Sequence, residues 1–202
     1  SLEFAGESRA EKLKRLRQTM QKNQADAYLL SSLDDLAWLY NYRGQDVHCS
    51  PVAIAHSLVF QDKAVLFMEK EKVSADLQAK FQDDGIELRS YYDVGSVLEA
   101  LPESGALLLD PAKTSQKLFN HVSKSAKIIE KPNITASMKA VKNETEIAGM
   151  RAAHIRDGAA MVKFLYWLSK NIGKDKITEI SAADKLEQFR SQQPNFQGIS
   201  FD

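Results

Sequence analysis

The sequence predicts an α/β protein in which a mixed, six-stranded sheet is flanked by helices and followed by the first helices of an incomplete second domain. Three observations predict this fold. Short apolar runs typical of strands alternate with helix signals over the first 130 residues. Two of these runs, 52–60 and 64–67, are separated only by Gln61-Asp62-Lys63, which predicts an antiparallel hairpin. Two amphipathic helices follow residue 138.

Each predicted strand is a short apolar run bounded by turn residues. The run Ala106–Leu109 is continuously apolar, which predicts a central strand that is buried on both faces. Most of the intervening helices are introduced by residues typical of N-caps. The predicted strands are 27–30, 52–60, 64–67, 86–91, 106–109 and 127–130. The predicted helices begin at Ser8, Ser32, Val73, Asp93 and Ser115, and the last of these ends at Ser123.

The stretch Lys131-Pro132-Asn133 is predicted to link two domains, residues 1–133 and 134–202. After it, Asn143 and Glu146 have the spacing of a capping box at the start of a long helix. Thr178 starts a second helix. Because the second half of the long helix is apolar on nearly all sides, we expect it to be covered on more than one face.

The composition excludes several classes of partner. Lys plus Arg and Asp plus Glu both number 27, so the net charge is zero, which argues against a surface for nucleic acid or anionic membrane. The apolar runs are shorter than the roughly 20 residues that a membrane span needs. The single cysteine, Cys49, cannot form an internal disulfide and favours a cytoplasmic location.

Motifs for metal or phosphate binding are absent from the sequence, which has no H-E-x-x-H, no paired C-x-x-C and no glycine-rich phosphate loop. His154 lies on the apolar seam of the long helix, where a packed histidine is favoured over a general base. His48 and Cys49 are adjacent but lack a third group that would orient a catalytic pair. His56 is expected in a strand core, and His121 on a helix surface.

The loop Tyr42-Arg43-Gly44-Gln45-Asp46 is the polar cluster that suggests function. It follows the aromatic end of a predicted helix and precedes a core strand. We predict that Tyr42, Arg43 and Asp46 belong to a substrate-cleft or interdomain loop. The alternative is an ion pair between Arg43 and Asp46 that only locks this loop.

Two stretches resemble a known family. The sequence AVKNETEIAGMRAAHIRDGAAM, followed by TEISAADKLEQFR, is similar to the start of the catalytic domain of Xaa-Pro aminopeptidases (aminopeptidase P) of the creatinase/prolidase pita-bread superfamily. The sequence LDDLAWLYNYRGQDVHCSPV resembles the middle domain of its three-domain members. The resemblance implies a creatinase N-terminal-like domain followed by the opening of a catalytic domain, without the first domain or the catalytic sheet.

For the parent protein, the resemblance implies a metallopeptidase that releases the N-terminal residue from proline-containing peptides of the form Xaa-Pro. Two divalent metal ions, usually manganese, activate the attacking water in this family. None of the family's ligands falls on a residue of this sequence, so no catalytic or metal residue is expected here, and the fragment alone is expected to be inactive.

The resemblance also implies a cytoplasmic homodimer that forms through the catalytic domain. The loop that corresponds to 42–46 can lean over the active-site mouth in pita-bread enzymes, whereas in three-domain members the first domain supplies the substrate-facing arginine. Two other readings stay open. One is a prolidase or creatinase relative, and the other is a non-catalytic peptide- or histone-binding protein on the same fold.

Overall fold

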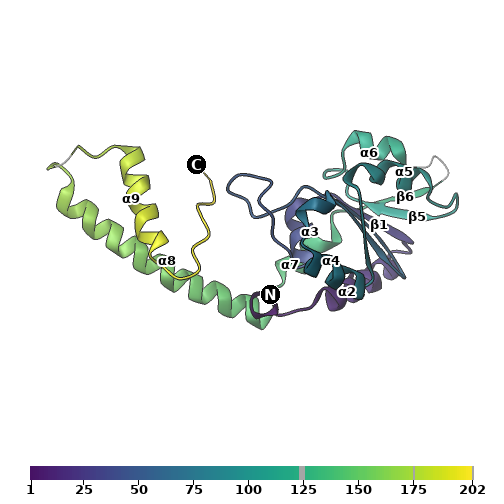
Figure 1. Ribbon diagram of the computed structural model, residues 1–202, viewed down its shortest axis with the longest axis horizontal. Coiled ribbons are helices and arrows are strands. Elements are labelled where there is room, and N and C mark those ends of the chain that lie inside the picture. Colours follow the sequence, from purple (N-terminus) through teal and green to yellow (C-terminus); the bar gives the residue numbers. More distant parts are fainter. Residues whose placement is uncertain (123–125, 175, 202) are drawn as a thin grey trace. The chain divides into compact units, whose positions relative to one another are not determined.

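The computed structural model describes residues 1–122, 126–174 and 176–201. The chain divides into two compact units, Ser1–Val141 and Lys142–Asp202. The first unit is the predicted α/β domain with a mixed, six-stranded sheet (Figure 1). The division between the units falls later than the predicted domain boundary at residue 133. The helix that follows Asn133 therefore belongs to the first unit.

The sheet has the strand order β4-β3-β2-β1-β5-β6. Strand β2 is antiparallel to both of its neighbours, β1 and β3, and the remaining pairs are parallel. The β2–β3 pair confirms the predicted hairpin. The strands are β1 (Ala27–Leu30), β2 (His56–Phe60), β3 (Ala64–Phe67), β4 (Ile86–Arg89), β5 (Ala106–Leu109) and β6 (Lys127–Glu130).

Helices cover both faces of the sheet (Figure 1). Alternate strand residues point to opposite faces, so Tyr28 and Leu30 pack into one core cluster and Leu29 into the other. This double cover explains why the central strands are continuously apolar. One face carries α2 (Arg9–Lys22), α3 (Leu33–Leu39), α4 (Ala75–Asp83) and α7 (Ile134–Ala140). The other face carries α5 (Val94–Glu99) and α6 (Gln116–His121).

Most predicted helix starts are confirmed, including Ser8, which forms a capping box with Glu11, and Ser115, which caps α6. Ser32 stands at the N-cap position of α3, but its hydroxyl accepts a hydrogen bond from Asn133 and does not cap the helix. The predicted helix end at Ser123 lies outside the described residues. Short turns not predicted from the sequence are α1 (Leu2–Ala5) and the 3-10 helices Lys70–Lys72 and Tyr91–Asp93.

Two strands are shorter than predicted. Strand β2 begins at His56 and not at residue 52, because residues 51 and 52 accept hydrogen bonds from the backbone of the preceding loop. Strand β4 ends at Arg89, because Ser90 caps the 3-10 turn that follows. The strand predicted over residues 52–60 is therefore formed only from His56 onward.

A buried polar network occupies the segment predicted as a linker. Asn133 is buried, and its backbone N–H donates to Asp110 Oδ2 at 3.0 Å. Asp35, which is 3% exposed, accepts from Thr135 Oγ1 at 3.0 Å and from Asn133 Nδ2 at 3.3 Å. The Nζ of Lys139 lies 2.6 Å from the other oxygen of Asp35. These bonds fix α7 to the N-terminus of α3.

The second unit contains the two predicted helices, α8 (Glu144–Asn171) and α9 (Glu179–Ser191). Both begin with the expected N-caps, Asn143 and Thr178, each in a reciprocal capping box. The helices pack together, and an ion pair joins Arg190 Nε to Asp157 Oδ1 at 2.6 Å. Within the described ranges, no helix combines the length and the apolar character needed to cross a membrane.

Candidate functional site

The candidate loop begins where α3 ends. The N–H of Tyr42 donates to Ala37 O, and the N–H of Asn41 donates to Trp38 O, which is the hydrogen-bond pattern of a Schellman motif. Asn41 has a positive φ of 50°, a left-handed conformation that asparagine adopts more readily than most residues. The chain therefore leaves α3 in a defined direction.

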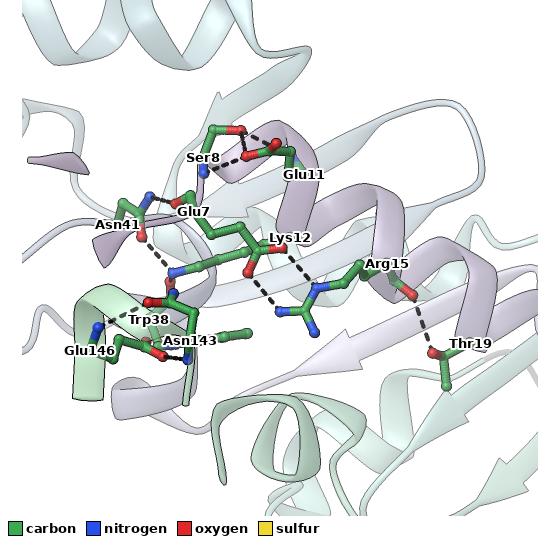
Figure 2. A network of polar contacts seen from close by, with 10 residues as sticks. All are labelled: Glu7, Ser8, Glu11, Lys12, Arg15, Thr19, Trp38, Asn41, Asn143 and Glu146. Carbon is green, nitrogen blue, oxygen red and sulfur yellow. Dashed lines mark hydrogen bonds and ion pairs between the residues drawn. The ribbon is translucent and has the colours of Figure 1, made fainter. Parts of the chain in front are cut away.

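The side chain of Lys12 in α2 holds the turn that ends α3 (Figure 2). Its Nζ donates to Trp38 O at 2.8 Å and to Asn41 Oδ1 at 2.7 Å. Asn41 Nδ2 in turn donates to Glu7 O at 2.8 Å. The two polar ends of the Asn41 side chain are thus held by two different parts of the N-terminal region.

Residues 42–55 then form a hairpin-like loop with two paired arms. Gly44 N–H donates to Pro51 O at 3.2 Å, and Asp46 N–H donates to Val52 O at 3.1 Å. A Cβ on Gly44 would lie 2.7 Å from the backbone N of Ala53, so the close approach of the arms requires glycine. These contacts make the loop a defined structural feature.

The three predicted site residues have different environments in this loop. Tyr42 is buried, its hydroxyl has no hydrogen-bond partner within the described part of the chain, and burial raises its pKa. Arg43 is exposed and makes no hydrogen bond or ion pair with any residue that the structure describes. Asp46 accepts from Ile54 N–H at 2.8 Å and lies 3.1 Å from Lys72 Nζ. The alternative ion pair between Arg43 and Asp46 is therefore not formed.

The contacts of Asp46 make the stability of the loop depend on pH. The hydrogen bond from the Ile54 backbone, with help from Lys72, lowers the pKa of this carboxyl. Because the folded-state pKa is lowered, the ionised carboxyl stabilises the loop at pH values above the ordinary aspartate pKa of about 4. This contribution is lost as the pH falls through the folded-state pKa.

Among the described residues, His154 and His56 make no contacts typical of a catalytic group. His154 is exposed on α8, where its Nδ1 lies 2.8 Å from Met150 O, so it bonds to a neighbour but is not packed as predicted. His56 is half-buried at the start of β2 and contacts Ser31 Oγ and Tyr91 OH. Burial lowers the pKa of His56. Nothing in these contacts supplies a nucleophile together with an anion-stabilising site.

Metal ligands are not gathered anywhere in the described ranges, where no group of three or more His, Cys, Asp and Glu residues could hold an ion. The fold and the loop thus define an α/β domain with an exposed, ordered polar loop. The chain belongs to the family described as Creatinase/Prolidase N-terminal domain, whose sequence profile matches residues 1–146.

The chain is similar to Xaa-Pro aminopeptidases from several organisms. It is 37% identical over 98% of its length to "Probable Xaa-Pro aminopeptidase P" of Sordaria macrospora and covers 34% of that protein. It is 38% identical over 98% of its length to Xaa-Pro aminopeptidase 1 of Dictyostelium discoideum and covers 32% of it. The crystal structure of X-prolyl aminopeptidase from Caenorhabditis elegans, described as a cytosolic enzyme with a di-nuclear active site, matches with a TM-score of 0.92 at 30% identity.

That structural match covers 100% of this chain and 34% of the C. elegans protein. The chain therefore spans about a third of the length of the relatives it matches. The similarity covers both compact units, including the two helices after Lys142 that lie mostly beyond the family profile.

Proposed function

We propose that this chain is part of a metal-dependent Xaa-Pro aminopeptidase, an enzyme that releases the N-terminal residue from peptides with proline second. The observation that carries the proposal is similarity along nearly the whole chain to proteins of that name, at 37–38% identity. In this enzyme, the first unit is the creatinase N-terminal-like domain. The helices α8 and α9 open the catalytic domain, for which the sequence suggests a start at residue 134.

The chemical step takes place outside this chain. The donors present do not fit a metal centre, because no suitable cluster exists among the described residues. The di-nuclear site of the C. elegans relative supports two divalent ions in the enzyme. Manganese is the ion that the family resemblance favours. Alone, the chain is an architectural fragment without hydrolytic activity.

The loop 42–55 gives this chain a role at the peptide cleft. Tyr42 and Asp46 hold the loop together, whereas Arg43 is exposed and presents five N–H donors. A guanidinium binds carbonyl and carboxylate oxygens well. We therefore assign Arg43 the role of binding an acceptor oxygen of the peptide, in addition to any arginine supplied by a first domain.

The description of the C. elegans relative as cytosolic, together with the single cysteine, supports a cytoplasmic enzyme. The zero net charge favours peptides over nucleic acid or membranes as partners. A homodimer formed through the catalytic domain is consistent with the exposed apolar side chains on α8.

A peptide assay tests this function. The gene product that contains this chain, supplied with Mn²⁺, should release the first residue of an Xaa-Pro tripeptide but not that of the matched Xaa-Ala tripeptide. Removal of metal with a chelator should abolish release. Cleavage of the Xaa-Pro dipeptide alone would indicate a prolidase. Binding without cleavage of any of the three would indicate a non-catalytic binding protein.

A further inference from the structure

Lys12 is a buried lysine whose position is not explained by the packing of α2 alone. It is 1% exposed, yet lysine is among the residues least often buried. Its Nζ lies between Trp38 O, Asn41 Oδ1 and the face of the Trp38 ring, whose centroid is 4.2 Å away (Figure 2). Each of these groups carries negative partial charge toward the ammonium.

The end of α3 is a suitable place for this charge. The last carbonyls of a helix lack intrahelical partners and form the negative end of the helix dipole, so a cation there is stabilising. Trp38 O is one of these carbonyls, and it also accepts from Asn41 N–H in the turn that ends α3. Lys12 therefore contacts the turn itself and not only the body of the helix.

Glu7 and Arg15 make further contacts around the same turn. Arg15 forms two hydrogen bonds of 2.7 Å with the Glu7 carboxylate, and its guanidinium lies 5.9 Å from the centroid of the Trp38 ring (Figure 2). The carbonyl of Glu7 accepts from Asn41 Nδ2. Asn41 is thus held from two sides, by Lys12 and by Glu7, in the left-handed conformation that directs the next residues.

We propose that Lys12 is a positioning residue for the loop 42–55, which it holds through Asn41 so that Arg43 is presented in one orientation. The role of Arg43 rests on the proposed function, whereas the ordering of the loop by Lys12 does not. Because the loop starts at the residue after Asn41, a change in the Asn41 backbone would move both of its arms.

Amide hydrogen exchange on this chain tests the ordering. Lys12→Met keeps the apolar stem but removes the charge and its hydrogen bonds. We expect exchange of residues 42–55 to become about tenfold faster or more, because the loss of even one of the two charge-assisted hydrogen bonds has an effect of that size, while exchange of β1 and β5 is unchanged. Lys12→Arg should restore part of the protection.

The matched control is Lys63→Met, because Lys63 also lies over an aromatic ring, that of Phe60, but far from the turn that ends α3. It should leave exchange of the loop unchanged. If Lys12→Met does not fold, Asn41→Gly replaces it, since glycine keeps the left-handed backbone but loses both side-chain bonds. Unchanged loop exchange, or a uniform increase throughout the first unit, would overturn the proposal.

A kinetic readout separates this inference from the proposed function. In the active gene product, Lys12→Met should raise KM for an Xaa-Pro peptide by a factor similar to that of Arg43→Ala, with kcat within a few-fold. The two changes combined should raise KM no further than either alone. Faster amide exchange of the loop together with an unchanged KM would refute the positioning role. A gene product with no peptidase activity would refute the proposed function and leave the exchange result to decide the ordering.

Discussion

Replacement of Asp35 by alanine is expected to lower the free energy of unfolding of the first unit by about 3–5 kcal/mol. The carboxylate is buried, and it accepts from Thr135 and Asn133 and pairs with Lys139. Its loss removes an acceptor that Thr135 and Asn133 share and the buried partner of Lys139, in a site of low dielectric. Urea unfolding followed by far-UV circular dichroism measures the change.

Asp34→Ala is the matched control for this prediction. Asp34 is the preceding residue and pairs with the same Lys139, but its side chain is 69% exposed. The loss of an exposed ion pair should cost less than about 1 kcal/mol. Equal losses for the two variants would show that burial of Asp35 does not decide its contribution, and that α7 is held by other contacts.

The second large effect concerns the apolar face of α8. Ile155 and Val162 are 74% and 67% exposed, and Leu165 is also exposed. These residues follow one another at intervals of seven and three, the spacing that two helices use to pack against each other. Helix α9 packs elsewhere on α8, through Asp157 and the region around Trp167. We expect a second copy of the chain to cover the exposed face.

Association through this face should depend on concentration. Since burial of each large apolar side chain is worth roughly 1.5–3 kcal/mol, the double variant Ile155→Glu, Val162→Glu should weaken association about a hundredfold or more. Ile180→Glu on α9 is the control, because Ile180 is equally exposed but outside this face. Light scattering over a range of concentrations measures the mass. A wild-type chain that stays monomeric throughout would contradict the prediction.

The sheet and the helix ends could be predicted from the sequence because local signals determine them. The capping boxes at Ser8, Asn143 and Thr178 and the apolar runs of the strands depend on residues a few positions apart. The hairpin β2–β3 follows from the short connection at 61–63. The family profile and the C. elegans structure agree with the fold that the resemblance implied.

The polar network around Asn133 could not be predicted in the same way. Asn133 meets Asp35 and Tyr28 only after the sheet has formed, with about a hundred residues between the partners. Pro132 and the surrounding polar residues favoured a linker, and tertiary contacts overrode that local signal. The sequence alone shows only that Asp34 and Asp35 stand in the first turn of a predicted helix, where acidic residues are common.

The candidate loop could be found from the sequence, but the roles within it could not. Its aromatic and charged residues predicted a functional loop, yet whether Asp46 pairs with Arg43 or with Lys72 depends on where the 3-10 turn at 70–72 lies. The contribution of Lys12 could not be predicted from the sequence for the same reason. A lysine on an amphipathic helix is usually solvated, and its contact with α3 is visible only in the folded unit.

Steady-state kinetics of Arg43→Ala in the gene product that contains this chain tests most directly whether the loop lines the peptide cleft. Loss of one charge-assisted hydrogen bond should raise KM for an Xaa-Pro tripeptide about tenfold or more, with kcat within a few-fold. Arg89→Ala, which removes an arginine from the edge strand, should change neither constant. A KM for Arg43→Ala equal to that of the wild type would contradict the assignment of the loop 42–55 to the substrate cleft.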